Sequence, residues 1–456
     1  MLDQYLHRYA EAETEALQGL LTWLPVQQRW ENVMVIPACN ETSGFLRAPP
    51  TCTGRSLMVL VINESVSASP VVSANNRLLA ESVQTRFEQR WRFSSQIPAY
   101  ELTLLCDAHS RRDVLLVDRF SDGRKFPVKS GVGLARKIGA DLAAWLIHRK
   151  AIGTDWIHCT DADVRLPETY FNASQQVKNT GSKVAALIYP FHHGNAQDPG
   201  AEPEVVLATL LYEFSLRYYV AGLKSARSPY AFHTIGSTMA VSASHYAKVR
   251  GFPKREAGED FYLLNKLAKV GAIEELTESA SCRAIEIEAR RSDRVPFGTG
   301  AAVNRLTALT DPLSDFRFYD PMVFELLRLW LQSLPLIWQS GTSHINADIF
   351  HPGVDVEGKR RKNRHVLLAC LNKIEVEKGL EHAFRQSRNL EQFTRQTHTW
   401  FDAFRTLKLI HTLRDCHFPS IRYASLEANQ NFRQILSQDA DLLTCLEAFR
   451  LKLIRI

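Results

Sequence analysis

The stretch WIHCTDAD, which runs from Trp156 to Asp163, decides the fold of this chain. Its first four residues are largely apolar, as in a strand that is buried in a sheet. Two aspartates, Asp161 and Asp163, follow with one residue between them. Because alternate residues of an extended segment point to the same side, we expect both carboxylates to lie together at the end of that strand. Open α/β sheets bind their ligands at this edge.

Short apolar runs occur on both sides of this stretch and alternate with helical segments. The predicted strands are VMVIP (33–37), LMVLVIN (57–63), LTLLC (102–106), VLLVD (114–118) and KVAALIYP (183–190). The segments 73–90 and 129–147 are predicted helices, and in the second one Leu134, Ile138 and Leu142 recur one helical turn apart. Strands that alternate with helices predict an α/β fold with a mostly parallel sheet flanked by helices.

The pattern changes near residue 310, beyond which strand signals nearly vanish. The segment 322–338 is apolar on almost every side, and residues 373–413 have helical spacing. We therefore predict three parts, namely an N-terminal helix (1–30), an α/β domain (31–310) and a helical C-terminal region (311–456).

Length, composition and charge favour a folded cytoplasmic protein. The chain has 456 residues, 45% of them hydrophobic and 23% charged, so it can bury a large core and is not disordered. Eight cysteines without a CxxC pair predict reduced thiols. The N-terminus lacks a basic start before an apolar core, so we expect no secretory signal. The 55 basic and 49 acidic residues give a net charge of +6, which suits an anionic substrate or a membrane surface and requires no nucleic-acid partner.

The apolar segment 322–338 allows two interpretations. It contains the charged residues Glu325 and Arg328, and Asp320 lies just before it, so we expect no membrane-spanning helix. In the first interpretation the segment packs against the α/β domain as part of a protein core. In the second it lies on an anionic membrane surface together with the basic run GKRRKNR (358–364), which would place the protein at the inner face of a membrane, beside a lipid-linked ligand.

A second acidic pair, Glu259-Asp260, follows Gly258 and opens a predicted helix. Acidic residues at a helix N-terminus are stabilised by capping and by the helix dipole, which explains the pair without any function. A catalytic role needs more, because a general base must have an acceptor hydroxyl within hydrogen-bond reach.

Polar residues also follow the first two predicted strands. Pro37 ends the first strand, and Cys39, Asn40 and Glu41 come next, while Asn63 ends the second strand. The carboxyl edge of a parallel sheet is a ligand position, and an ordinary strand-ending turn is the alternative.

A basic loop near the end of the α/β domain contains Arg290, Arg291 and Arg294, and the Gly-containing stretch PFGTG (296–300) follows it. Arginine side chains bind diphosphates and other anions through paired hydrogen bonds. The loop is therefore either a clamp for an anion or a solvated basic loop.

The order of these motifs resembles the family 2 glycosyltransferases, which have the GT-A fold. The resemblance rests on VMVIPACNE (33–41), GLARKIGADLA (133–143), WIHCTDAD (156–163) and GSTMAVSASHYAKVRGFPKREAGEDFYLLNKLAKVG (236–271). It covers about residues 30–300 and implies a GT-A-like catalytic domain. The sequence departs from the family where Asn63-Glu64 ends the second strand and where Lys137 follows Arg136.

The resemblance implies a role for each matching residue. The nucleotide base would be bordered by Pro37, Ala38, Glu41 and Asn63, and Arg136 would lie near the donor. Asp161 would touch the ribose or metal-bound waters, and Asp163 would bind a divalent metal (Mg²⁺ or Mn²⁺). Asp260 would be the general base, and Glu259 would help to place the acceptor. Arg294 is also predicted to bind the donor, because it belongs to the basic loop that could bind an anion.

These roles together predict transfer of a sugar from a nucleotide-sugar donor to an acceptor hydroxyl, with inversion at the anomeric carbon. The acceptor is a carbohydrate, a lipid-linked molecule or another small molecule. Two alternatives stay open, a sugar nucleotidyltransferase and a non-catalytic module that binds nucleotide sugars. The nucleotidyltransferase is less well matched, because PACNETSG (37–44) is not the Gly-rich basic loop that such enzymes carry after their first strand.

Overall fold

The structure, a computed structural model, describes residues 1–24, 30–47, 50, 54–107, 111–177, 183–194, 202–292, 298–350, 358–427 and 442–452. The chain forms two compact units. The first comprises Met1–Glu202 and Thr234–Ala301, and the second comprises Pro203–His233 and Ala302–Ile456. The three ranges predicted from the sequence, 1–30, 31–310 and 311–456, stay predictions.

The first unit contains a nine-stranded sheet in the order β11-β8-β10-β6-β1-β2-β5-β4-β3. Its strands are β1 (Asn32–Ala38), β2 (Ser56–Asn63), β3 (Glu88–Gln96), β4 (Ala99–Cys106), β5 (Arg112–Arg119), β6 (Trp156–Cys159), β8 (Val184–Ile188), β10 (Met239–Ser242) and β11 (Ala272–Glu275). Among these nine strands, only β4 and β10 run against the others. The predicted α/β class with a mostly parallel sheet is confirmed.

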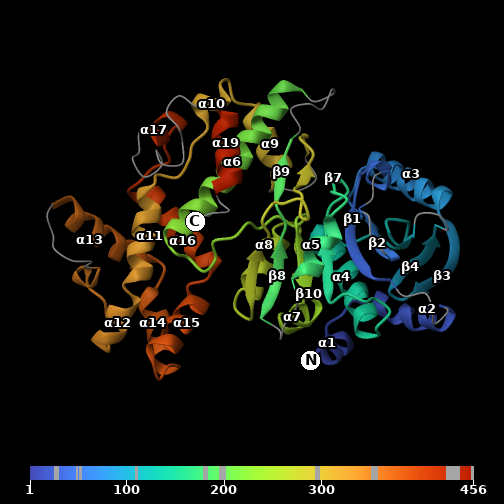
Figure 1. Cartoon of the computed structure of the whole chain (residues 1–456), viewed down its shortest axis with the longest axis horizontal. Helices are drawn as coiled ribbons and strands as arrows, with labels where there is room; N and C mark the ends of the chain where they lie inside the picture. Colours follow the sequence, from blue (N-terminus) through green and yellow to red (C-terminus); the bar gives the residue numbers. More distant parts are fainter. Residues whose placement is uncertain are drawn as a thin grey trace. The chain divides into compact units, whose positions relative to one another are not determined.

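Helices cover the sheet of the first unit. They are α1 (Leu2–Arg8), α2 (Leu17–Trp23), α3 (Pro70–Arg86), α4 (Val132–His148), α5 (Tyr170–Gln176), α7 (Ala243–Lys248) and α8 (Glu259–Leu267), together with the short 3₁₀ turns η1 (Ala12–Ala16) and η2 (Ser43–Leu46). Figure 1 shows α3 beside the half of the sheet that contains β1 to β4. The predicted helix 129–147 is confirmed as α4.

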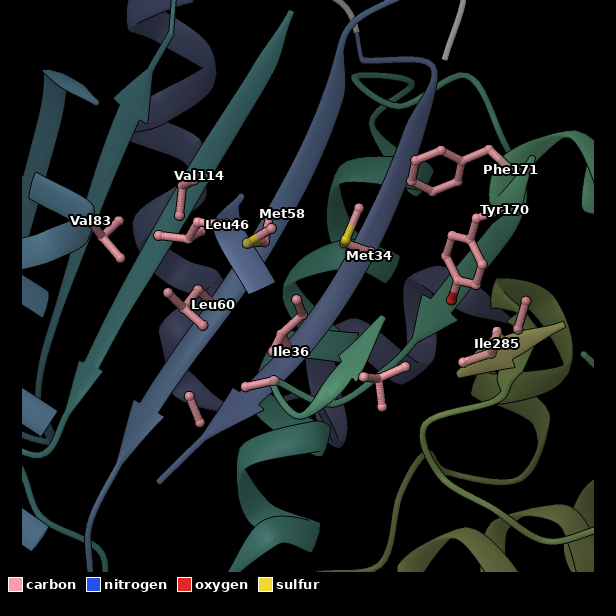
Figure 2. Packing of buried hydrophobic residues seen from close by; sticks show 14 of the residues in the cluster. Met34, Ile36, Leu46, Met58, Leu60, Val83, Val114, Tyr170, Phe171 and Ile285 are labelled. Carbon is pink, nitrogen blue, oxygen red and sulfur yellow. The ribbon is translucent and has the colours of Figure 1, made fainter. Parts of the chain in front are cut away.

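Alternate residues of the central strands form one face of the core. Met34 of β1, together with Met58 and Leu60 of β2, belongs to a cluster that also contains Tyr170 and Phe171 of α5, as Figure 2 shows. Their neighbours in the strands point to the other face, where α4 packs against β1 and β2. Burial of both faces explains why these strands read as continuous apolar runs in the sequence.

The edge strand β3 is the main element that the sequence analysis missed. The predicted helix 73–90 ends earlier, at Arg86, and β3 then pairs with β4 in an antiparallel hairpin. Most of β3 is exposed and polar, so it lacks the alternation of apolar residues that marks a half-buried strand. The first strand also continues past Pro37, because β2 pairs along its whole length while β6 pairs only as far as Val35.

A second, smaller sheet lies at the carboxyl end of β6. It contains β7 (Val164–Arg165), β12 (Ile285–Ile287) and β9 (Phe191–His193), in that order. Ile287 pairs with Val164, and the amide of Glu288 donates to the carbonyl of Asp163 over 3.2 Å. This pairing carries the chain after Ile287 to the residues that follow β6.

The second unit is helical, as predicted for the C-terminal region. Its helices are α6 (Pro203–Ser225), α10 (Pro312–Asp315), α11 (Met322–Gln332), α12 (Leu334–Ser340), α13 (Gly358–Lys373), α14 (Val376–Arg385), α15 (Leu390–Trp400), α16 (Ala403–Cys416), α17 (Tyr423–Glu427) and α19 (Leu442–Lys452), with the 3₁₀ turn η3 (Ala347–Ile349). Helix α9 (Thr299–Thr307) begins in the first unit and ends in the second.

The apolar segment 322–338 packs inside this helical unit. Trp330 has no exposed surface, and the ring of Trp338 stacks on Phe384 with 5.6 Å between the ring centres. Trp330 and Trp338 therefore pack against residues of the helical unit itself, while packing of the segment against the α/β domain and contact with a membrane surface both stay predictions. Among the described residues, every helix is too short or too polar to cross a lipid bilayer.

A buried ionic cluster attaches the N-terminal segment to α4. Lys137 donates to Asp141 over 2.8 Å and to the hydroxyl of Tyr5 over 2.8 Å, and Asp141 also accepts from the hydroxyls of Tyr5 and Tyr246. Burial raises the pKa of the Asp141 carboxyl above its ordinary value, and the Lys137 ammonium opposes that shift. Lys137, the departure from the family pattern noted above, thus supports the packing of α1 and α7 on α4.

We predict that Lys137→Met lowers the free energy of unfolding by about 3–5 kcal/mol, because it leaves the Asp141 carboxylate buried without its cation. Urea titration followed by tryptophan fluorescence measures this change. Lys183→Met, on the exposed surface of the same unit, is the matched control and should change stability by less than about 0.5 kcal/mol. Equal stability of the two variants would contradict the structural role of Lys137.

Candidate functional site

Carboxylates from three distant parts of the first unit are tied together by two arginines. The predicted pair Asp161 and Asp163 follows β6 at the carboxyl end of the sheet, where the amide of Thr160 still donates to Val35 of β1 over 3.1 Å. Ala162 points into the core cluster, while the side chains of Asp161 and Asp163 keep 32% and 20% of their surface exposed. The alternation expected from the sequence is therefore present, with the alanine inside and both carboxylates accessible.

Arg136 of α4 is the centre of the first group. Its guanidinium donates to Asp161 over 2.5 Å, to Glu259 over 2.8 Å and to the carbonyl of Gly236 over 2.8 Å. Only 3% of this side chain is exposed. Burial by itself lowers the pKa of the guanidinium, but the nearby carboxylates of Asp161 and Glu259 raise it by more, so Arg136 keeps its charge.

Gly236 makes room for this arginine. A Cβ atom at position 236 would lie only 2.7 Å from Nη2 of Arg136 and 2.9 Å from its Cζ. Any side chain at this position would therefore push the guanidinium away from its three partners. Sequence reasoning missed the role of Gly236, although it is the first residue of the quoted stretch 236–271.

Glu259 and Asp260 occupy the first turn of α8, and Gly258 before them adopts a left-handed conformation with φ of 73°. Glu259 is buried and points to Arg136, whereas Asp260 is partly exposed and accepts from the amide of Phe261 over 2.7 Å. Burial, followed by the charge of Glu259, raises the pKa of Asp260 to about 7, while Arg136 and backbone hydrogen bonds from Phe261 and Gly236 act in the opposite direction. Asp260 can therefore exchange a proton near neutral pH.

Arg290 is the centre of the second group. Its two terminal nitrogens donate to the two carboxylate oxygens of Glu41, over 3.0 and 2.7 Å, and one of them also donates to Asp163 over 2.5 Å. The Arg290 side chain keeps 28% of its surface exposed, far more than Arg136. Burial lowers the pKa of Arg290, but the hydrogen bonds that it donates to Glu41 and the charges of Asp163 and Glu41 raise it by more, so this guanidinium is also charged.

The small sheet explains why Arg290 reaches these partners. Strand β12 ends at Ile287, and the hydrogen bond from Glu288 to the carbonyl of Asp163 holds the chain beside the end of β6. Glu41 is held from the opposite direction, because the turn after β1 is fixed by a hydrogen bond from the amide of Asn40 to Asn76 of α3. The three charged groups therefore meet although Arg290 lies 249 residues from Glu41 and 127 residues from Asp163.

The predicted base-binding residues lie at the same edge of the sheet. Pro37 and Ala38 end β1 and are buried. The side-chain nitrogen Nδ2 of Asn63, at the end of β2, donates to the backbone carbonyls of Ala38 and Val61 over 3.1 and 3.3 Å. In the structure Asn63 therefore connects the ends of two strands, and recognition of a base by this residue stays a prediction.

The structure thus brings nine of the ten predicted site residues to one edge of the first unit. They are Pro37, Ala38, Glu41, Asn63, Arg136, Asp161, Asp163, Glu259 and Asp260. Arg294 lies outside the described residues. Arg290, which the sequence placed only in a general anion clamp, is the arginine that contacts Asp163.

The carboxylates of Asp161 and Asp163 can supply only some of the ligands that a divalent cation needs. The described residues contain no group of three or more histidines, cysteines, aspartates or glutamates that could enclose a metal ion. Two partly exposed carboxylates do suit a cation such as Mg²⁺, which keeps several waters and is shared with the phosphates of a substrate. These two carboxylates therefore fit a metal ion that enters together with a nucleotide, and they do not fit an ion that the protein encloses permanently.

Comparison with known proteins gives only a weak likeness. No protein-family model matches the chain, and no curated protein matches it. Among solved structures, the chain is similar to the mannosyltransferase PcManGT from Pyrobaculum calidifontis in complex with GDP-Man and Mn²⁺, with 14% identity, 100% of this chain and 99% of that chain covered, and a TM-score of 0.32. A likeness of this size carries no weight, and the site rests on the contacts described above.

The raised pKa of Asp260 predicts a pH-dependent effect of Asp260→Asn on stability. The native carboxyl binds a proton up to about pH 7, whereas its ordinary value is 3.8, so the native protein loses stability as the pH rises between these values. The variant lacks this loss, and its melting temperature relative to the parent should increase from pH 4 to pH 7.5. Asp122→Asn, at a fully exposed carboxylate, should show no such trend.

Proposed function

We propose that the protein is a glycosyltransferase that moves a sugar from a nucleotide-sugar donor to an acceptor hydroxyl, with inversion at the anomeric carbon. The observation that carries this proposal is the connection of Asp161 to Glu259 through Arg136. It joins the end of a parallel strand, where a nucleotide would bind, to the start of a helix that holds a carboxyl group with a pKa near 7. The motif order that resembles the family 2 glycosyltransferases supports the same function.

Asp260 is suited to the role of general base. A group that takes a proton from an acceptor hydroxyl works best when its pKa is close to the working pH, and the pKa of Asp260 is about 7. Glu259 is paired with Arg136, and its charge beside Asp260 contributes to the raised pKa of Asp260. A single base with no enzyme nucleophile leads to direct displacement and therefore to inversion.

The opposite side of the site is suited to a diphosphate. Asp161 and Asp163 would hold a divalent cation together with the phosphates, and such a cation, when bound, stabilises the charge of the leaving nucleoside diphosphate. Arg290 forms ion pairs with Asp163 and Glu41 and is partly exposed. Its guanidinium can therefore exchange these carboxylates for the phosphates of a donor that binds. Arg136 is buried and stays with Asp161 and Glu259, so we assign it the role of positioning both carboxylates.

A donor screen is the first experiment. The melting temperature is measured with UDP, GDP, CMP and dTDP sugars, each with and without Mn²⁺, because a ligand that binds only the native state raises it. The ligand that stabilises the protein is then tested for turnover, with water or a panel of sugars and lipid-linked sugars as acceptors. Release of pyrophosphate from a nucleoside triphosphate would instead indicate a nucleotidyltransferase, and binding without turnover would indicate a binding module.

We predict that Asp260→Asn lowers kcat by about 10²–10⁴-fold, because the variant has no base. In the parent protein kcat should rise with pH through about 7, since only the carboxylate accepts the proton. Asp163→Asn should lower donor turnover as well, and part of the loss should return at high Mn²⁺ concentration. Full turnover by both variants, with Asp122→Asn as the control for a lost exposed charge, would refute the assignment.

We predict that Arg290→Ala raises the donor KM by about tenfold or more, because a charge-assisted hydrogen bond to the diphosphate is lost. Initial rates at varied donor concentration measure this change. The neighbouring Arg291→Ala is the matched control, since Arg291 is more than half exposed and pairs with the exposed Glu202. An unchanged KM in Arg290→Ala would remove this residue from the donor site.

A further inference from the structure

The helical unit contains a cavity of about 540 Å³ that is separate from the carboxylate site. All the described residues that line it belong to the second compact unit. Its walls come from α6, from α9 beyond Ala302, from the segment 316–319 and from α16. The volume lies within the range of about 300–1,000 Å³ that is usual for small-molecule sites.

One continuous face of α6 forms the first wall. Tyr212, Ser215, Leu216 and Tyr219 line the cavity, and their spacing of three, four and seven residues places them on the same side of the helix. Tyr218 of the same helix lines the cavity as well, so the wall presents three tyrosines and a leucine, a surface that is largely apolar and also carries hydroxyl groups.

A matching face of α9 forms the second wall. Ala302, Arg305 and Leu306 of α9 lie on one side of the helix and line the cavity, and Leu309 adds to this wall just after the helix ends. Ala302 and Leu306 are 4% and 3% exposed, whereas Arg305 is exposed. The aliphatic residues therefore lie deep in the cavity and the arginine lies at its opening.

The segment 316–319 provides an aromatic wall that is already ordered. The rings of Phe316 and Phe318 meet edge to face at 4.8 Å, and Phe318 is only 2% exposed. The hydroxyl of Tyr319 lies 2.9 Å from Nε2 of His411, and its ring lies 5.9 Å from that of Tyr219. A ligand would thus find rigid rings and would not have to order them, which favours affinity.

Among the described residues that line the cavity, the charged ones are Arg305, Arg317 and Arg414. Arg317 is exposed and donates to the backbone carbonyls of Ser314 and Phe316, and Arg414 pairs with the adjacent Asp415 over 2.6 Å. No aspartate or glutamate is among the described lining residues. The opening is therefore positively charged above an apolar interior.

We propose that this cavity binds an organic phosphate, with its apolar chain or ring against Leu306 and Phe318 and its phosphate at Arg305 and Arg317. Arginine is the side chain that matches the phosphate geometry best, and the apolar depth excludes inorganic phosphate as the main ligand. The ligand is either a soluble phosphate ester or the phosphate headgroup of a membrane lipid. The proposal concerns only the second unit and holds whether or not the first unit transfers sugars.

Isothermal titration of the full chain with octyl phosphate, below its micelle concentration, tests the proposal. Octyl phosphate should bind at least tenfold more tightly than octanol or inorganic phosphate, because it alone uses both parts of the cavity. Equal affinity for octyl phosphate and octanol would overturn it. Flotation with phosphatidylcholine vesicles, with and without phosphatidic acid, then identifies the source, since binding to the acidic vesicles indicates a lipid headgroup and its absence indicates a soluble ester.

The double variant Arg305→Ala/Arg317→Ala should weaken octyl phosphate binding by about tenfold or more, because both groups at the opening are lost. Arg328→Ala/Arg385→Ala removes two other exposed arginines of the same unit and is the matched control. It should bind as the parent does. An equal loss in both double variants would show a general charge effect and would overturn the proposed site. Both residues at the opening are exposed, so thermal melting should be unchanged.

Discussion

The buried guanidinium of Arg136 is the interaction on which the candidate site depends. It lies on the central helix α4 and connects the end of β6, the loop before β10 and the start of α8. A buried charge is tolerated only when it is paired and hydrogen-bonded, and here two carboxylates and a carbonyl meet that need. Since each partner belongs to a different element, the same contacts that neutralise the arginine also set the distances between these elements.

The two arginines of the site differ in the way they are held, and the difference matters for function. Arg136 is almost completely buried and comes from a helix, whereas Arg290 follows a short strand and is partly exposed. Rigid groups preserve geometry, while exposed groups on loops can change partners. A site that binds a diphosphate needs both properties. Some charged side chains must be fixed before the substrate binds, and others must exchange their ion-pair partners for the phosphates when it does.

The helical unit has a chemistry of its own. Its aromatic cavity is lined by α6, α9, α16 and the segment 316–319, and the charged residues among its described lining are arginines, whereas the edge of the sheet in the first unit is rich in carboxylates. The two sites therefore favour different ligands. An acidic edge with balancing arginines suits a cation together with a diphosphate, and an apolar cavity with a basic opening suits an amphiphilic anion.

The sequence by itself determined the α/β class, the strands β1, β2 and β6, the helix α4 and the acidic pairs at 161–163 and 259–260, because burial on both faces of a parallel sheet leaves uninterrupted apolar runs and polar residues where the strands end. It missed the exposed edge strand β3, which has no apolar alternation. Only the tertiary structure decided that Arg290 lies on Glu41 and Asp163, that Gly236 makes room for Arg136, and that α6 and α9 enclose a cavity. These contacts join residues far apart in the chain, and no local periodicity records which distant side chains will meet.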